Sequence, residues 1–424
     1  MRRHTLQTIV PVAGRLLGCA LLTLGTCCPP TQAAQRGYES YFMYLYQSPY
    51  DEDPSFLDGI DEVQGLAHDA DHWFVTTTCG NGESDDKNGA IWKIPVKYDL
   101  AHVSGSETGI CGVLLSRDLP ELCAQGYWHV GDADQYRGFL VVPVESCDRT
   151  RFPHALFFFN AETLAYLGNA TLRGWSNLAW VAVNPADGHI YLSDEKVTNL
   201  EEFVLSPDWT NLTHEPPPSL ALQHVASAHL WAEDGSALPE VFRVTQGGAF
   251  SECGTIFFFM VGDYKNQYGS DGLHAFDTTT WRRIMRSSED RPATACMDFY
   301  YHWDPGGGSC GEPEGLDVWD LDNEPRSPYW GQLHAVMLDN DTGTQNELSI
   351  YHYSNALYVD ALSGGGDGRP QSPFPTVQQA YARACDGARL KIVPTTYLEN
   401  LTLNKRLILD SHGAGTVRIG GSPP

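Results

Sequence analysis

Basic residues are scarce in this sequence. It carries 27 Lys and Arg against 53 Asp and Glu, which gives a formal net charge of −26 at pH 7. Nucleic acids and anionic membrane surfaces both attract clustered Lys and Arg. The charge balance therefore argues against either as a partner, and it is compatible with a cation, a neutral glycan or simple solubility.

Several catalytic motifs are absent as well. No GxSxG nucleophile elbow occurs, and the glycine runs at 306–308 and 364–368 are followed by turn residues, which does not predict a phosphate loop. None of the cysteine spacings matches a zinc site. The sequence therefore assigns no catalytic residue and leaves open whether the protein is an enzyme.

No segment is long and apolar enough to span a membrane, and the first 33 residues instead have the features of an export signal. Three arginines precede the apolar run at 16–26, and Ala33 ends a stretch suited to cleavage. We predict a signal peptide and a protein that is secreted, periplasmic or at the cell surface. A lipoprotein is the alternative, because Cys19 and Cys27 lie in imperfect lipobox sequences.

Eight cysteines follow the predicted signal, and an even number in an exported protein indicates disulfides. Because eight cysteines allow 105 pairings, sequence proximity is the only guide to connectivity. It favours Cys123 with Cys147 and Cys296 with Cys310.

Short strands bounded by turn residues dominate residues 59–353, and helical periodicity is nearly absent. Five times, a polar element with a small residue is followed by a strand, a turn and another strand; the small residues are Gly65, Gly131, Ala179, Gly248 and Gly315. This repetition predicts an all-β fold, a five-bladed β-propeller, with a sixth blade if a degenerate one lies in 205–245.

A β-sandwich or two stacked barrels are the rival folds, because they also contain many short strands. The repeated small residue favours the propeller, since it allows the innermost strands to approach closely at the axis. The pattern resembles secreted bacterial propellers in general, without matching a named subfamily.

The last segment changes character. YVDA (358–361), GGDG (365–368) and PFPTVQQA (373–380) precede TYLENLTLNKRLILD (396–410). In this order the phrases resemble the start of a right-handed parallel β-helix of the pectate-lyase type, with a capping helix before the first coils. The resemblance implies a polysaccharide-active family whose catalytic residues lie in later coils, which this sequence lacks. The coils would then need a stacking partner or the rest of a longer chain.

Residue spacing agrees with that resemblance. An apolar stripe at helical spacing predicts a helix that can cover the open end of a β-helix, and its residues are Phe374, Val377, Ala380, Tyr381 and Ala384. Four leucines are predicted to point inward from the following strands, namely Leu401, Leu403, Leu407 and Leu409. The predicted parts are a signal peptide (1–33), a propeller (34–355) and a truncated β-helix with an N-terminal capping helix (356–424).

Ligands of propellers usually bind at the mouth of the central channel, where the innermost strands converge. Polar residues around the repeated small residues are therefore the ligand-binding candidates. They are Gln64, His129, Asp132, Asp134, Gln246, Glu314 and Asp317. The alternative is that these side chains cap strand ends and satisfy backbone groups in turns.

Three of the candidates would suit a hard cation. Calcium takes six to eight oxygen ligands, and Asp132, Asp134 and Glu314 could supply carboxylates. Secreted propellers similar to gluconolactonases or calcium-dependent phytases use such ions, although their ligand sets are not matched here residue by residue. Calcium is accordingly the cofactor that the sequence suggests.

Three functions remain open from the sequence. We favour an exported binding protein that recognises carbohydrate or a cell-surface component at the channel mouth. The second is a calcium-assisted hydrolase or lyase acting on a polysaccharide or a small ester. The third is a structural module of a surface assembly, in which the C-terminal coils stack on a partner.

Overall fold

The computed structural model consists mainly of short β-strands. It describes residues 44–47, 62–78, 89–100, 107–148, 150–194, 196–212, 219–238, 241–262, 272–286, 311–322, 324–339, 347–354, 356–366, 368, 370, 372–384, 388–405 and 407–420. The predicted signal peptide and four cysteines lie outside these residues, and those cysteines are Cys79, Cys296, Cys310 and Cys385.

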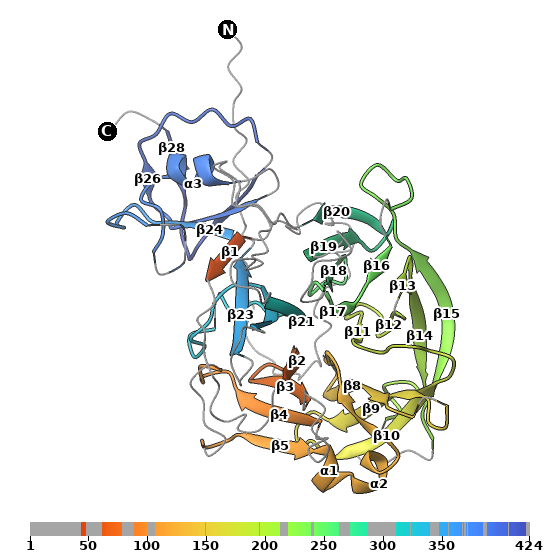
Figure 1. The fold of residues 1–424 in the computed structure, drawn as a ribbon. Helices are drawn as coiled ribbons and strands as arrows, with labels where there is room; N and C mark the ends of the chain where they lie inside the picture. The colour runs from red at the N-terminus through yellow and green to blue at the C-terminus, as the bar shows by residue number, and fades with distance from the viewer. Residues whose placement is uncertain are drawn as a thin grey trace.

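Five antiparallel sheets are arranged radially around one axis, so the fold is a five-bladed β-propeller (Figure 1). From the axis outward, blade 1 contains β2 (Glu62–His68), β3 (His72–Thr78), β4 (Ala90–Pro95) and β5 (Cys111–Leu114). Blade 2 contains β6 (Tyr127–Val130), β8 (Phe139–Ser146), β9 (His154–Asn160) and β10 (Tyr166–Leu172), with β7 (Asp134–Tyr136) also paired to β8. Blade 3 contains β11 (Ala182–Val183), β12 (Ile190–Leu192), β14 (Asn199–Ser206) and β15 (Ala221–His229). Blade 4 contains β17 (Thr245–Phe250), β18 (Ile256–Val261), β19 (Gly272–Asp277) and β20 (Arg282–Arg286).

Blade 5 closes the ring with strands from distant parts of the chain. It contains β21 (Gly311–Val318), β22 (Leu333–Asp339) and β23 (Glu347–Ser354), and its outermost strand is β1 (Tyr44–Gln47). β1 pairs antiparallel with β23. The first described strand thereby becomes part of the last blade, and backbone hydrogen bonds close the propeller.

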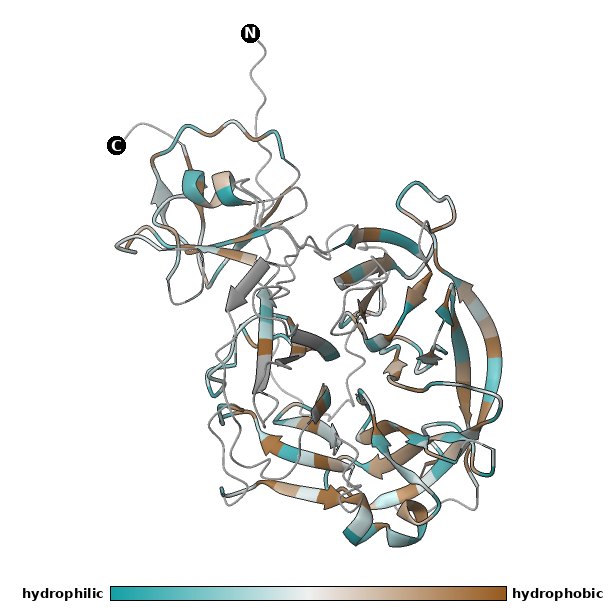
Figure 2. Ribbon diagram, in the orientation of Figure 1, coloured by the Kyte–Doolittle hydropathy of each residue, from teal (hydrophilic) through white to brown (hydrophobic). Residues whose placement is uncertain are grey.

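A buried hydrophobic cluster fills each of the five interfaces between neighbouring blades. The strand β18 shows how the sequence produces this: Phe258 packs toward blade 5, whereas Phe257 and Phe259 pack toward blade 3. Side chains of a strand alternate between its faces, so a strand buried on both faces needs a continuous apolar run. Figure 2 shows such hydrophobic stretches on strands of every blade.

The predicted propeller is confirmed, with five blades. The sixth blade considered for 205–245 is wrong, because β15 is the outermost strand of blade 3 and β16 (Phe242–Arg243) pairs with β13 (Lys196–Val197). Most residues of β15 are exposed, with Ala228 its one buried residue, so the strand has no alternating apolar pattern to reveal it.

Residues 356–420 form a smaller unit beside blade 5, here called the C-terminal module (Figure 1). Its strands β24 (Ala356–Val359), β25 (Arg389–Ile392) and β27 (Ile408–Ser411) pair in parallel, as do β26 (Thr396–Tyr397) and β28 (Arg418–Ile419). The predicted helix is present as α3 (Val377–Arg383), capped by the Thr376 side chain, which accepts a hydrogen bond from the Gln379 backbone N–H. That this module begins a β-helix stays a prediction.

Two of the four leucines predicted to face inward do not. Leu403 and Leu409 are 47% and 43% exposed, whereas Leu401 and Leu407 pack against the core of the C-terminal module. Within β27 the less exposed positions are Ile408 and Asp410, so the strand turns Leu409 to the opposite face from the one predicted.

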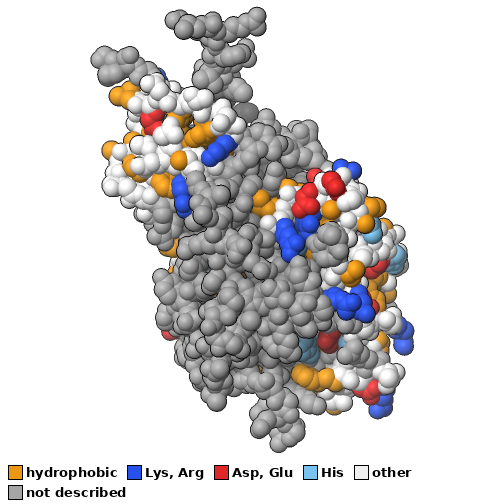
Figure 3. Space-filling model, turned by 45° about the horizontal axis from the view of Figure 1, so that its top comes forward, with side chains coloured by type: hydrophobic (Ala, Val, Ile, Leu, Met, Phe, Trp, Pro, Cys, Tyr) orange, Lys and Arg blue, Asp and Glu red, His pale blue; other side chains and the backbone are white. Residues whose placement is uncertain are grey.

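Two short helices, α1 (Leu115–Asp118) and α2 (Pro120–Cys123), follow blade 1. Cys123 and Cys147 do not form the disulfide predicted from their proximity. Within the described ranges, none of the helices has the length and hydrophobicity to cross a membrane. On the face shown in Figure 3, acidic, basic and hydrophobic side chains are interspersed over the described surface.

Candidate functional site

The innermost segments of the blades meet at one buried carboxylate, that of Asp132. Its Oδ1 accepts a hydrogen bond from the Leu66 N–H at 3.1 Å, and its Oδ2 accepts one from the Leu316 N–H at 3.2 Å. Its backbone N–H donates to the Ala179 carbonyl at 2.8 Å, and its carbonyl accepts from the Val181 N–H at 3.1 Å. One residue of blade 2 thereby joins blades 1, 3 and 5.

Three glycines surround this carboxylate, and we call Gly65, Asp132, Gly247 and Gly315 the axial junction. A Cβ on Gly65 would lie 2.4 Å from Asp132 Oδ1, and a Cβ on Gly315 would lie 2.4 Å from both that oxygen and the Gly65 Cα. A Cβ on Gly247 would lie 2.9 Å from Asp132 Oδ2. Of the predicted small residues, Gly65 and Gly315 make their close approach at this carboxylate, whereas a Cβ on Gly131 would meet the Ala179 backbone and one on Gly248 would meet the Trp180 ring. In blade 4 the glycine beside the carboxylate is Gly247, one residue before the predicted position.

Burial raises the pKa of Asp132 well above its usual range, although the N–H groups of Leu316 and Leu66 favour its charged form. Its oxygens accept backbone hydrogen bonds from neighbouring blades. Asp134 acts similarly, because its Oδ2 accepts from the Val183 N–H of blade 3 at 2.6 Å. These contacts give both acids a strand-joining role, which is the structural alternative considered for the candidates.

The axial junction divides the sequence-predicted candidates into two groups. The innermost strands run in the same direction because the blades repeat radially, so residues before and after the junction lie toward opposite ends of the axis. Gln64, Gln246 and Glu314 each precede a junction glycine, and His129 precedes Asp132; we call their side the start end. Asp134 and Asp317 follow the junction, at the exit end.

At the start end, His129 lies beside a carboxylate. His129 Nδ1 is 3.6 Å from Glu145 Oε2, and Glu145 Oε1 accepts a hydrogen bond from the Leu178 N–H at 2.6 Å. Burial lowers the pKa of His129, and the charge of Glu145 opposes this only in part. Gln64 and Glu314 are buried. The start end therefore holds candidates that are partly or wholly shielded from solvent.

At the exit end, His68 and Asp317 form a fixed pair. His68 Nδ1 lies 2.7 Å from Asp317 Oδ2, and the imidazole stacks on Trp319 with ring centroids 4.7 Å apart and planes 13° apart. The His68 side chain is 28% exposed and that of Asp317 8%. Burial disfavours the protonated imidazole, but the charge and hydrogen bond of Asp317 prevail and raise the pKa of His68.

Two further acids lie near this pair. Burial and the charge of Asp317 raise the pKa of Asp134 to about 7, while the Val183 and Gln135 N–H groups and His68 oppose the shift. Glu252, an exposed residue of the turn between β17 and β18, has a raised pKa because surrounding protein and Asp320 disfavour its charge, and because His68 and Lys391 only partly offset them. We call His68, Asp134, Glu252 and Asp317 the axial cluster.

Buried groups contact Trp319, the residue on which His68 stacks. Trp73 packs edge-on against Trp319 with ring centroids 4.6 Å apart, and His334 Nε2 lies 2.9 Å from the Trp319 carbonyl oxygen. Burial lowers the pKa of His334 to about 4, so this histidine is neutral near pH 7 and serves as packing. The Trp319 ring on which His68 stacks is therefore held by buried neighbours.

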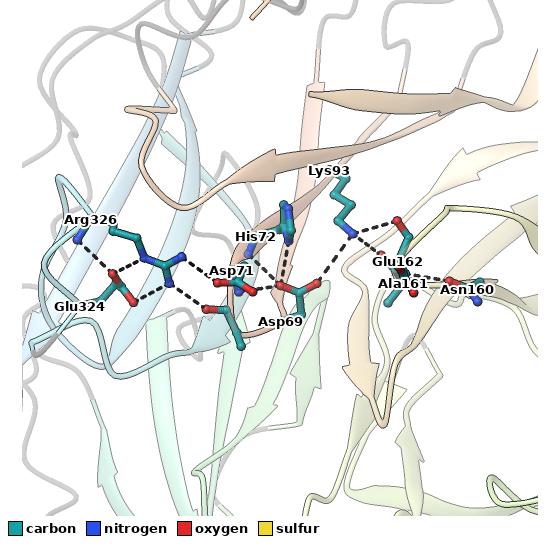
Figure 4. Close-up of polar contacts among 10 residues, drawn as sticks. Asp69, Asp71, His72, Lys93, Asn160, Ala161, Glu162, Glu324 and Arg326 are labelled. Carbon is teal, nitrogen blue, oxygen red and sulfur yellow. Dashed lines mark hydrogen bonds and ion pairs between the residues drawn. The ribbon is translucent and has the colours of Figure 1, made fainter. Parts of the chain in front are cut away.

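The turn after His68 is tied to both neighbouring blades (Figure 4). Arg326 of blade 5 donates to Asp71 Oδ1 at 2.7 Å and to the Ala70 carbonyl at 3.4 Å. On the other side, Lys93 of blade 1 donates to the Ala161 carbonyl of blade 2 at 2.8 Å and lies 3.9 Å from Asp69 Oδ2. These contacts fix the end of β2, and with it the position of His68.

The C-terminal module borders the same region. Asp322 of blade 5, whose side chain is 0% exposed, accepts a hydrogen bond from the Tyr358 hydroxyl at 2.7 Å and lies 3.4 Å from Lys391 Nζ. Lys391 also donates to the Tyr358 hydroxyl at 2.9 Å. These contacts join the C-terminal module to the segment of blade 5 that follows Asp317.

Sequence reasoning missed His68 and Glu252. His68 follows Gly65 by three residues, just as Asp134 follows Gly131, so a comparison of residues after each small residue would have found it. Glu252 lies in the turn between β17 and β18, outside the repeated pattern around the small residues, and carries no such signal. Among the residues that the structure describes, no group of three or more His, Cys, Asp or Glu side chains is placed to hold a metal ion; calcium binding by Asp132, Asp134 and Glu314 stays a prediction.

Comparison with known proteins assigns the chain to no family. No protein-family model and no curated protein matches the sequence. A GH43_1 enzyme from Xanthomonas citri is similar in structure, at 10% identity over 75% of this chain and 92% of that one, with a TM-score of 0.41. An α-L-arabinofuranosidase from Podospora anserina is similar at 10% identity over 74% of this chain and 97% of that one, with a TM-score of 0.41. A luciferin-regenerating enzyme is similar at 13% identity over 70% of this chain and 77% of that one, with a TM-score of 0.37. These similarities concern the propeller fold alone.

Proposed function

We propose that this chain is an exported protein that binds a carbohydrate at the exit end of the propeller axis. The observation that carries the proposal is the His68–Asp317 pair, held at 2.7 Å, stacked on Trp319 and still partly exposed. A polar group that is fixed by its neighbours and yet accessible is suited to recognition, because little freedom is lost on binding.

The chemistry of the axial cluster favours a neutral ligand rich in hydroxyl groups. Carboxylates only accept hydrogen bonds, and hydroxyl groups can donate them. The acidic composition of the chain disfavours anionic ligands. Asp134, Glu252 and Asp317 therefore suit the hydroxyls of a neutral glycan.

We also propose that the C-terminal module is the capped start of a right-handed parallel β-helix. The parallel pairing of β24, β25 and β27 and the position of α3 before β25 support this, together with the sequence resemblance. The resemblance to a family of polysaccharide-active proteins is then a second, independent indication of a glycan ligand. Because Lys391 and Tyr358 of this module contact Asp322 of blade 5, a long glycan could contact both parts of the molecule.

A glycan array with the folded protein, followed by calorimetry on the retained glycans, tests this function. We expect His68→Ala to weaken binding about 10- to 100-fold, the loss typical of a hydrogen bond to a charged or strongly polar group. His224→Ala is the matched control, because His224 forms a similar pair with Glu201 at 2.7 Å on the outside of blade 3. Unchanged binding by His68→Ala, or no retained glycan at all, would contradict the proposal.

A further inference from the structure

A row of titratable side chains crosses blade 5 on the face toward blade 1. His334 of β22 lies directly opposite Asp317 of β21 on one side and opposite His352 of β23 on the other. The two histidines are 0% and 1% exposed. Because side chains alternate along a strand, His334 shares the face of Val336, which packs into the cluster between blades 5 and 1. The row therefore runs from an acid of the axial cluster into the buried interface of the two blades.

Hydrogen bonding fixes where the protons of the two histidines lie. A carbonyl oxygen only accepts, so the 2.9 Å contact of His334 Nε2 with the Trp319 carbonyl places a proton on that nitrogen. In the neutral ring the lone pair is then on Nδ1, which lies 2.6 Å from His352 Nδ1. His352 Nδ1 therefore carries a proton and donates a hydrogen bond to His334. This chain of hydrogen bonds exists only while His334 is neutral.

A proton added to His334 disrupts this arrangement. The lone pair that takes the proton is the one on Nδ1, so two N–H donors would then face each other. The new charge would lie in the buried interface, where Trp73 packs edge-on against His334 with ring centroids 5.2 Å apart. A buried charge without a partner is costly. Opening the interface of blades 5 and 1 to water removes both penalties.

We propose that His334 and His352 form an acid-sensitive latch, closed at neutral pH and opening in acid, that couples the interface of blades 5 and 1 to ligand binding at the exit end. Opening releases Trp319, which His334 holds through its carbonyl and Trp73 through its ring. His68 stacks on Trp319, so the exit end keeps its form only while the latch is closed. The coupling to a ligand rests on the proposed function, whereas the latch itself does not.

The charged groups around His334 set the pH range of the latch. Burial lowers the pKa of His334 to about 4, and the charge of His68 adds to this effect. The hydrogen bond to the Trp319 carbonyl and the charges of Asp317 and Asp322 oppose it without cancelling it. The groups of β2 and β21 that face the latch therefore leave His334 neutral until the solution is acidic.

The surroundings of His352 act in the same direction. Burial, and then the charge of His334, lower the pKa of His352 well below its usual range. On its other side the Tyr329 ring stacks on His352 at 4.4 Å between centroids, and the Tyr329 hydroxyl donates to Asp99 at 2.6 Å. An open interface restores the ordinary pKa of 6.5, so the open form binds more protons below that pH. The closed latch is therefore fully stable above pH 6.5 and loses stability as the pH falls from there toward 4.

Urea unfolding of the full-length protein at pH 7 and pH 4.5 tests the latch. In the double variant His334→Gln/His352→Asn, the amides can place an N–H near each donor position and do not titrate. Between these pH values we expect the unfolding equilibrium constant of the wild type to rise about 100-fold more than that of the double variant, the factor that the shift of His334 alone gives. His224→Gln, which removes a histidine that is 50% exposed, is the control and should follow the wild type. Equal pH dependence of the wild type and the double variant would overturn the proposal.

Hydrogen exchange of the wild type tests the latch without any variant. After correction for the intrinsic exchange rate, we expect amide protection in β22 and β23 to fall about 100-fold between pH 7 and pH 4.5. Protection in β18 and β19 of blade 4 should fall less than about 10-fold. Equal losses in blades 4 and 5, or none in blade 5, would contradict the latch.

A glycan retained on the array, added at pH 4.5, tests the coupling. A ligand that binds the closed form stabilises it, so we expect the glycan to restore protection in β22 and β23. Unchanged exchange in the presence of a glycan that binds at pH 7 would show that the latch does not regulate the site. If no glycan is retained on the array while the latch opens in acid, the proposed function fails and the latch stands.

Discussion

Asp132 is the residue on which the propeller axis depends. Its carboxylate replaces the hydrogen-bond partners that the Leu66 and Leu316 N–H groups lack at the inner edges of their sheets. A buried N–H without a partner costs about 1–3 kcal/mol of stability. The position is therefore occupied by an acid even though its burial disfavours the charge.

Replacing Asp132 tests this role directly. We expect Asp132→Ala to lower the free energy of unfolding by about 3 kcal/mol, because two buried N–H groups lose their acceptor. Asp132→Asn keeps the shape and one acceptor oxygen, so its loss should be smaller. Urea unfolding measures both values, and an Asp132→Ala variant as stable as the wild type would contradict the role.

The pairing of His68 with Asp317 could not be predicted from the sequence. The small residue and its polar neighbours mark where each innermost strand starts, and they led to Asp132 and Asp317. Their mutual placement depends on pairing between blades that are distant in sequence. The His68–Asp317 contact joins residues 249 positions apart, so no local pattern contains it.

At the scale of elements, glycines allow the innermost strands to approach one another closely at the axis. A Cβ on Gly65 would meet the Cα and the carboxylate of Asp132, and a Cβ on Gly315 would meet the same carboxylate and the Gly65 Cα. Backbone atoms cannot move aside as the end of a flexible side chain can. Each glycine is therefore required by close approach, not by an unusual backbone angle.

Gly65→Ala is the corresponding test. We expect it to lower the free energy of unfolding by about 1–3 kcal/mol or more, the cost of overpacking against fixed atoms. Gly364→Ala is the matched control, because a Cβ there meets no atom within 4 Å, and it should leave stability unchanged. Equal losses for the two variants would show that the axis is not closely packed.

The strands with apolar alternation or continuous apolar runs were predictable from the sequence. The run HWFVTTT (72–78), rich in aromatic and β-branched residues, coincides with β3, and the runs around Phe157 and Phe258 fall within β9 and β18. β15 was not predictable, because its exposed residues carry no alternation, nor was β1, whose place in blade 5 depends on pairing with β23. Elements without a buried face leave little signal in the sequence.

At the scale of the whole molecule, the propeller and the C-terminal module share a buried polar contact. Asp322, Tyr358 and Lys391 satisfy one another between blade 5 and the parallel strands. Removing one partner of such a network leaves a buried charge or donor unpaired. This contact places the module at the exit end, where the proposed ligand binds.

The central claim is that the exit end of the axis, and not the start end, is the ligand site. A crystal structure of the full protein soaked with a glycan retained on the array tests it most directly. We predict a sugar hydroxyl or glycosidic oxygen within hydrogen-bond distance of His68 Nε2 and a second contact to Glu252. A glycan bound at the start end, beside Gln246 and His129, would contradict it.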